Sequence, residues 1–265
     1  YIEEVLKEGE TLGFDGRVVS VGEGEGYAAI AGKKNAKVNY QVDLIDEIWE
    51  DRPVLSEEPA FNLDVKYAGE TVASKLARIR EEIREAMKKE KTTVHVLTTL
   101  DDIVWLLNIR GNDIDFFPLV LSYGIITMDS FELYIDEKKL DDKLKAKLAK
   151  DGVNLHPYND IYEDVKKFGS DVVAMIDPGK LNYALFNNIP ENVKTVEKRN
   201  PAILMKAIKN PVEIENIRKA QIKDSVAHVR FMKWLKENVG KMRITEMSAS
   251  DKLDEFRAEM GKFIR

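Results

Sequence analysis

Between residues 67 and 199, segments with helical spacing of apolar residues alternate with short strand-like runs. Apolar residues recur three or four apart over residues 71–89, and β-branched or aromatic residues gather at 94–97, 122–127 and 131–136. The turn-forming triplet Met128-Asp129-Ser130 joins the last two runs. Such alternation around one hairpin predicts an α/β domain with helices on the faces of a mixed sheet.

The rest of this region continues the alternation and sets the bounds of the domain. Further helices are predicted at residues 101–108, 141–150, 161–168 and 181–187, and further strands at 153–157, 172–176 and 193–196. Gly152 follows the second of these helices and is a good C-terminal cap. We therefore expect a three-layer, mixed-sheet domain spanning residues 67–199.

Residues 1–66 contain too few elements for a closed core. The pattern predicts a helix end at 2–7, a strand at 17–21, a helix at 27–36 and a strand at 37–42. Two prolines and the lack of helical spacing then mark residues 52–66 as a linker. We interpret residues 1–66 as the C-terminal part of a first α/β domain plus this linker.

Residues 200–265 are predicted to be helical. Asn210, Pro211 and Glu213 form a strong helix start, and apolar residues then recur at helical spacing as far as Gly240. Thr245 opens a second helix that runs through Glu259. Because two helices alone cannot bury such faces, we expect a partner domain, and we interpret the chain as the middle of a longer protein.

Composition excludes several classes of function. The chain has 265 residues, a net charge of −6 and no cysteine. The charge argues against nucleic acid as a partner, and the missing cysteine excludes disulfides and thiol catalysis. No apolar run reaches the length of a membrane span, and the acidic start YIEEVLKEGE does not fit a signal peptide. A cytoplasmic protein is therefore expected.

The glycine-rich run from Gly22 to Gly26 resembles a dinucleotide-binding loop only superficially. The third required glycine would fall at Tyr27, and two glutamates would repel a pyrophosphate. We therefore interpret this run as a flexible surface loop.

Histidines and paired carboxylates do not form a recognisable catalytic set. His95, His156 and His228 are far apart in the sequence and lack metal-ligand spacing, so each is interpreted as a structural or surface residue. Asp101 and Asp102 are adjacent, and neighbouring helical side chains point about 100 degrees apart. We therefore expect no shared site there, and we expect Asp101 to cap or precede the short helix.

One polar cluster is a candidate site. Arg110, Asn112 and Asp113 follow an apolar helix end and precede the apolar segment that starts at Phe116. A Gly-Asn turn between two apolar segments would place Arg110 and Asp113 at an edge. This cluster is either a substrate-facing or interface loop, or a structural turn held by an Arg-Asp ion pair.

Four segments in the same order resemble Xaa-Pro aminopeptidases (aminopeptidase P, of the creatinase/prolidase-type metallopeptidases). They are DLIDEIWEDRP (43–53), TTLDDIVWLLNIRGND (98–113), AILMKAIKNPVEIENIRKAQIKDSVAHVRFMKWL (202–235) and ITEMSASDKLDEFRAEM (244–260). The resemblance implies a creatinase/prolidase N-terminal-type domain at its centre. It also implies a partial α/β domain before it and helices opening a pita-bread catalytic domain after it.

The same resemblance implies a parent enzyme that removes an N-terminal residue preceding proline. Such enzymes use two divalent metals, usually manganese, held by two Asp, one His and two Glu, and act on short peptides as homodimers. This chain ends before the first ligand, so we expect no catalytic residue and no bound metal in it. The expected role is to shape access to the active site and to support dimerisation. The alternatives are a stand-alone binding or assembly module without peptidase activity, and a fragment of a prolidase- or creatinase-like enzyme.

Overall fold

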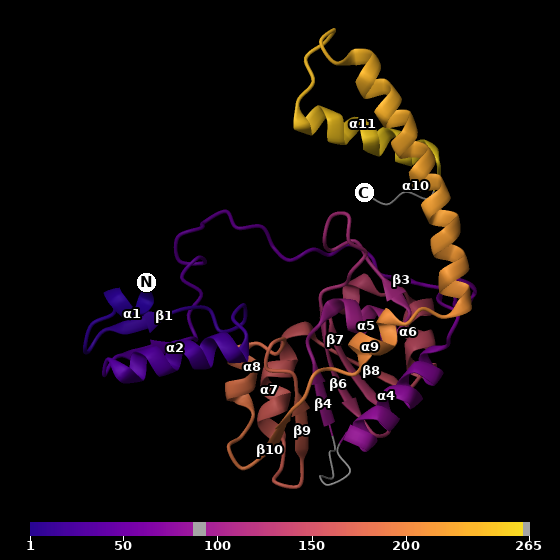
Figure 1. The fold of residues 1–265 in the computed structure, drawn as a ribbon. Helices are drawn as coiled ribbons and strands as arrows, with labels where there is room; N and C mark the ends of the chain where they lie inside the picture. Colours follow the sequence, from indigo (N-terminus) through magenta and orange to yellow (C-terminus); the bar gives the residue numbers. More distant parts are fainter. Residues whose placement is uncertain (87–93, 262–265) are drawn as a thin grey trace.

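Six strands form the central sheet in a computed structural model that describes residues 1–86 and 94–261 (Figure 1). In spatial order they are β10 (Lys194–Glu197), β9 (Val173–Ile176), β4 (Val94–Leu97), β6 (Ser122–Thr127), β7 (Phe131–Ile135) and β8 (Val153–His156). β4 pairs antiparallel with β6, and β6 with β7, while the pairs β10–β9, β9–β4 and β7–β8 are parallel. The sheet is therefore mixed, as the sequence predicts.

Helices cover both faces of this sheet, because successive side chains of a strand point to opposite sides. In β7, Leu133 belongs to one buried apolar cluster and Tyr134 to the other. The Leu133 side receives α4 (Val72–Ala86), α5 (Leu100–Leu106) and α6 (Asp142–Lys150). The Tyr134 side receives α7 (Ile161–Asp164) and α8 (Tyr183–Asn188).

Most predicted elements of this region lie where the sequence places them. β4 and β6 match their predicted bounds, and α6 ends before Gly152, which has a φ of 79° and so takes the left-handed conformation that ends a helix. The predicted helix over 71–89 is α4, although residues 87–89 lie outside the described residues. The local spacing of apolar residues thus predicts most helices and strands of the sheet region.

The first segment contains α1 (Ile2–Val5), α2 (Val21–Lys33) and a two-stranded parallel sheet of β1 (Thr11–Gly13) and β2 (Lys37–Asn39). The predicted strand at 17–21 is wrong, and the helix predicted over 27–36 begins earlier, at Val21. Ser20 explains this start. Its Oγ accepts from the Glu23 amide at 3.3 Å, while Glu23 Oε2 accepts from the Ser20 amide at 3.2 Å, which completes a capping box.

The glycine run is therefore neither a flexible loop nor a nucleotide site, but the first turns of α2. Gly24 is buried against the ring of Tyr183 in α8, and a Cβ there would overlap that ring. The Val21 amide donates to Leu181 O at 2.9 Å, and the Gly22 amide donates to Pro178 O at 3.1 Å. Gly24 therefore allows α2 to dock closely on the sheet domain.

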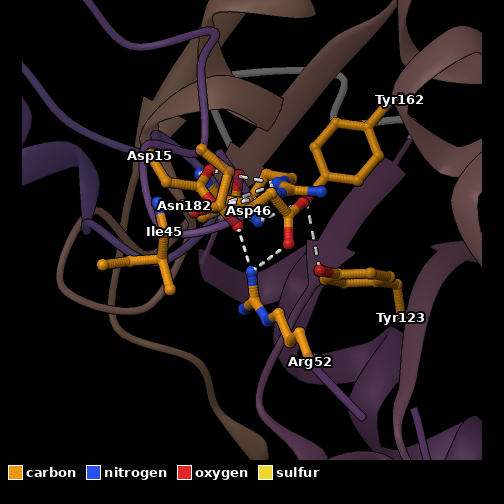
Figure 2. Close-up of polar contacts among 9 residues, drawn as sticks. Asp15, Ile45, Asp46, Arg52, Tyr123, Tyr162 and Asn182 are labelled. Carbon is orange, nitrogen blue, oxygen red and sulfur yellow. Dashed lines mark hydrogen bonds and ion pairs between the residues drawn. The ribbon is translucent and has the colours of Figure 1, made fainter. Parts of the chain in front are cut away.

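Carboxylates and arginines of the first segment gather at this junction (Figure 2). Arg52 Nη1 donates to Asp43 Oδ2 at 2.7 Å and to Asp46 Oδ1 at 2.5 Å. Arg17 donates to both oxygens of Asp15 and reaches Asp43 at 3.1 Å. The hydrogen bonds to Asp15 raise the pKa of Arg17 above its ordinary value. Arg52 of the sequence WEDRP, residues 49–53, therefore has a structural role, because it fixes the start of the linker to Asp43 and Asp46.

Hydroxyl groups of the sheet domain face the same junction. Asn182 Nδ2 donates to the Tyr162 hydroxyl at 3.1 Å, and the hydroxyls of Tyr162 and Tyr123 are 3.2 Å apart (Figure 2). Burial raises the pKa of Tyr123 and of Tyr162 above the ordinary range, so both hydroxyls stay protonated at neutral pH.

The linker pairs with the sheet domain through a short strand, and the C-terminal helices extend from that domain. β3 (Phe61–Asn62) pairs antiparallel with β5 (Ile109–Arg110), and α3 (Val65–Ala68) follows. α9 (Ala202–Ala207) leads to α10 (Pro211–Asn238), which projects from the domain, and α11 (Glu246–Glu259) folds back on it (Figure 1). Arg257 Nε donates to Asp224 Oδ1 at 2.7 Å and fastens α11 to α10.

The long helix has the predicted start and the predicted exposed apolar face. Asn210 and Glu213 form a capping box around its first turn. Ile222 and Val229 are 67% and 69% exposed. Throughout residues 1–86 and 94–261, no helix is both long and apolar enough to cross a membrane.

Candidate functional site

The end of α5 places Arg110 at the mouth of a cleft. Asn108 stops the helix with a φ of 51°, a left-handed conformation that Asn tolerates better than most residues. Its Nδ2 donates to Glu70 O at 2.8 Å, and its Oδ1 accepts from Lys75 Nζ at 2.8 Å. The chain then enters β5, where Arg110 pairs with Phe61 of the linker strand.

The guanidinium of Arg110 is only partly used by the fold. Its Nη1 donates to Val104 O at 2.9 Å and to Ile109 O at 2.7 Å. Within the described parts of the chain, its Nε and Nη2 make no hydrogen bond, and no carboxylate forms an ion pair with it. Burial lowers the pKa of Arg110, yet an arginine side chain stays charged in proteins.

The cleft beside Arg110 has a volume of about 430 Å³ and lies between α3, α5, α9, the start of α10 and the loop before β6. Its charged lining residues are Lys75, Asp101, Arg110, Lys206, Lys209 and Glu213. Its apolar wall includes Trp105, Phe117 and Ile217. Basic groups therefore outnumber acidic groups, four to two.

Lys75 supplies a buried positive charge beneath the cleft. Its Nζ donates to Trp105 O at 2.8 Å and lies 4.3 Å from the centre of the Trp105 ring, a cation–π distance. Burial lowers the pKa of Lys75 to about 8, so the ammonium is mostly charged at pH 7 and loses its proton as the pH rises through 8.

Glu213, the nearest acid on α10, is occupied by other contacts. Its Oε2 accepts from the Asn210 amide at 2.9 Å, and its Oε1 accepts from Trp105 Nε1 at 3.4 Å. These contacts cap α10 and tie it to α5. They leave Glu213 as a counter-charge to Arg110 rather than a direct ion-pair partner.

Asn112 and Asp113 do not share the environment of Arg110. Asp113 Oδ2 accepts from the Leu121 amide at 2.7 Å and from Lys139 Nζ at 2.6 Å, and both members of this ion pair are at least 97% buried. The predicted Arg-Asp ion pair is therefore wrong, because Lys139 takes the carboxylate. Asn112 Oδ1 and Asp113 Oδ1 are buried and have no partner among the described residues.

The rim of the cleft contains a strained aromatic turn. Phe116 has a φ of 62°, which is unfavourable for a bulky residue, and it is 59% exposed. Phe117 beside it is 53% exposed and lines the cleft. Exposed aromatic residues on a strained turn are typical of a binding loop.

Asp101 and Asp102 do meet at one point, which corrects the expectation that they share no site. Lys206 from α9 donates to Asp101 Oδ2 and, at 2.7 Å, to Asp102 Oδ1. Asp101 neither caps nor precedes α5, because the N-cap residue is Thr99 and Asp101 lies in the first turn of the helix. The two acids anchor α9 to α5, which is a structural task.

A buried polar chain continues from Asp102 into the sheet. Asn200 Nδ2 donates to Asp102 Oδ2 at 2.8 Å, and Asn200 Oδ1 lies 3.2 Å from His95 Nε2. His95 Nδ1 lies 3.1 Å from Met175 O. Burial lowers the pKa of His95, outweighing these hydrogen bonds, which raise it. This chain of contacts fixes the segment between β10 and α9.

Neither of the other histidines stands near this cleft. His156 Nε2 contacts Glu132 Oε2 at 2.7 Å on the far edge of the sheet, and His228 is exposed on α10. No group of three or more His, Asp or Glu side chains with metal-binding geometry occurs in the part of the chain that the structure describes.

Sequence reasoning missed Lys75, Trp105 and Lys206 as members of the cleft. A signal for Lys75 was present, because it lies three residues after Val72 and four before Ile79, on the buried face of α4. A lysine at a core position calls for a specific partner. Lys206 carries no such signal, since its partners are more than 100 residues away in the sequence.

Comparison with known proteins finds relatives that agree with one another in family. A family model described as the creatinase/prolidase N-terminal domain matches residues 51–213. A probable Xaa-Pro aminopeptidase P of Sordaria macrospora is 34% identical over 277 residues, covering 97% of this chain and 43% of that protein. An Xaa-Pro aminopeptidase of Caenorhabditis elegans is 34% identical, covering 98% of this chain and 42% of that protein. The chain spans less than half the length of these relatives.

Solved structures give the same result. The crystal structure of X-prolyl aminopeptidase from C. elegans, described as a cytosolic enzyme with a di-nuclear active site, superposes with a TM-score of 0.90 at 31% identity. The match covers 99% of this chain and 43% of that one. An Xaa-Pro dipeptidase from Bacillus anthracis has a TM-score of 0.50 at 16% identity, a likeness of fold alone.

Proposed function

Since this chain belongs to the creatinase/prolidase N-terminal domain family, we propose that it is a non-catalytic portion of an Xaa-Pro aminopeptidase. The parent enzyme would remove an N-terminal residue that precedes proline from short peptides. This portion would shape access to the active site and support a homodimer. The observation that carries the proposal is the match of 99% of the chain to 43% of the C. elegans enzyme, at a TM-score of 0.90.

The proposal also assigns the three regions of the chain. Residues 1–66 would be the end of a first α/β domain with its linker, 67–199 a three-layer domain, and 200–265 the opening helices of a pita-bread domain. The exposed apolar residues of α10 support the last assignment, because Ile222 and Val229 on a stable helix call for covering.

The parent enzyme would bind two divalent metals, manganese in our proposal, and the C. elegans relative is described as having a di-nuclear active site. The residues described in this chain do not fit such a centre, because none of their acidic and histidine side chains form a metal-ligand group. We therefore assign no metal-dependent step to this chain. A cytoplasmic location is proposed from the relative described as cytosolic.

The segment containing Arg110, Asn112 and Asp113 is proposed as part of a substrate- or interface-facing loop. The cleft beside Arg110 supports this for the arginine and for the exposed Phe117. The buried Asp113 instead holds the loop in place through Lys139. A stand-alone binding module is the second candidate, and the same cleft favours it. A prolidase-like parent has less support, because the dipeptidase match reaches only 16% identity.

A peptidase assay tests the proposal. The 265-residue chain and the full-length C. elegans enzyme would each be incubated with manganese and a short peptide with proline at the second position. The full-length enzyme is expected to release the first residue, and the chain is expected to release none. Turnover by the chain that a chelator abolishes would show that it carries its own catalytic centre.

A further inference from the structure

We infer that the cleft at Arg110 is a binding site for the carboxylate of a short peptide, which the unused edge of the guanidinium would hold through two parallel hydrogen bonds. This inference rests on the proposed function for the class of ligand, a short peptide. The site itself is deduced from the contacts of Arg110 and the composition of the cleft.

The geometry of Arg110 leaves one side of the fork available. Both protons of Nη1 have acceptors, the carbonyls of Val104 and Ile109. These two bonds fix the plane of the guanidinium, while the Nε–H and Nη2–H groups remain without partners among the described residues. The edge formed by Nε and Nη2 matches the spacing of two carboxylate oxygens.

The charge balance of the cleft favours an anion. Lys206 pairs with Asp101 and Asp102, so these three side chains together carry a net charge of −1. The remaining lining charges are Arg110, Lys75 and Lys209 against Glu213, a net charge of +2, so the cleft together with Asp102 carries a net charge of +1. Glu213 acts on Arg110 only through its charge and not through a direct ion pair, so a carboxylate ligand would be the first acid bonded to the partly buried guanidinium.

The walls of the cleft favour a peptide over a simple ion. Trp105, Phe117 and Ile217 provide apolar surface next to the cationic groups. A volume of about 430 Å³ falls in the range of small-molecule sites. A C-terminal carboxylate with an adjacent apolar side chain or proline ring would meet both kinds of surface. Phosphate would meet only the charges.

The test compares two forms of one peptide. The tripeptide Ala-Pro-Leu, with a free carboxylate or with a C-terminal amide, would be titrated into the 265-residue chain. Binding would be followed by calorimetry and by the Nε–H resonance of Arg110. We expect the acid to shift that resonance. We expect the amide to bind more weakly than the acid by a factor of about ten or more. Equal affinity of both forms, or no shift with acid at about 10 mM, would overturn the inference.

Two variants locate the effect. Arg110→Lys keeps the charge but removes the fork, and is expected to weaken binding of the acid about tenfold. Arg78→Lys is the matched control, because Arg78 lies on α4, pairs with Glu70 at 2.7 Å and does not line the cleft. An unchanged affinity in Arg110→Lys would count against the assignment. The comparison of acid with amide needs only the unaltered chain, so it stands even if a variant fails to fold.

A pH series adds an independent readout. Lys75 lies beneath the cleft and has a pKa of about 8, while the peptide carboxylate stays ionised throughout this range. The N-terminal amine of the peptide also titrates near pH 8, so this series uses N-acetylated Ala-Pro-Leu. Its affinity should fall as the pH rises through 8 and Lys75 loses its proton. Measuring binding and turnover separately distinguishes this inference from the proposed function. A chain that neither binds nor cleaves the peptide would contradict the inference alone. A chain that cleaves the peptide would contradict the proposed function.

Discussion

Replacing Lys139 with methionine would leave the Asp113 carboxylate buried without its counter-charge. The two side chains are 3% and 1% exposed, and Nζ lies 2.6 Å from Oδ2. At an effective dielectric constant of about 20, charges at this distance attract by about 6 kcal/mol before desolvation. Removing one member of a buried pair costs about 3–5 kcal/mol net. We expect a loss of that size in the free energy of unfolding.

Urea unfolding measures this loss, followed by the fluorescence of Trp105 after Trp49 and Trp234 are replaced by phenylalanine. Trp105 reports on the sheet domain, because it is buried there. Lys138→Met is the matched control. Its ion pair with Glu57 has the same 2.6 Å distance but is exposed, so no measurable change is expected. A Lys139→Met protein as stable as the control would refute a buried ion pair beneath the Arg110 loop.

Three further outcomes are expected. Gly24→Ala should destabilise the docking of α2 on Tyr183 by about 1–3 kcal/mol. Gly26 has open space around it, so Gly26→Ala should be neutral or stabilising. Hydrogen exchange of the α2 amides distinguishes the two variants. Burial lowers the pKa of His95 in the folded chain, so the unfolded chain binds a proton at this imidazole first as the pH falls. The free energy of unfolding should therefore decrease as the pH drops below about 6.5. An NMR titration of His95 in the folded chain with a midpoint at or above that value would contradict this. Asn210→Ala should cost about 1 kcal/mol and speed amide exchange in the first turn of α10, and unchanged exchange would count against the cap.

Local sequence patterns predicted the sheet domain well. The helical spacing of α4, the strand-like runs of β4, β6 and β7, and the capping signal at Asn210 all depend on neighbours within a few residues. Such signals survive in the folded chain because each element buries the face that its own sequence makes apolar. The mixed sheet and its antiparallel hairpin followed from these elements.

The errors lie where distant residues decide the local structure. One error is different, because the start of α2 at Val21 has a local signal in the Ser20–Glu23 capping box that was missed. The docking of Gly24 on a ring about 160 residues later in the chain could not be predicted locally. The Arg110–Asp113 pair failed because Lys139, 26 residues beyond Asp113, takes the carboxylate. Asp101 and Asp102 meet through Lys206 for the same reason. Arg110 could be proposed as a site residue, but only the structure shows which of its nitrogens remain available.

We propose that this chain supports a catalytic centre without containing one. The direct measurement is manganese binding: the purified 265-residue chain is loaded with manganese, dialysed, and its metal content determined by mass spectrometry. We expect manganese to be lost to background, because the described side chains form no group of ligands for it. One or two manganese ions retained per chain, and released when acidic residues of this chain are replaced, would contradict it.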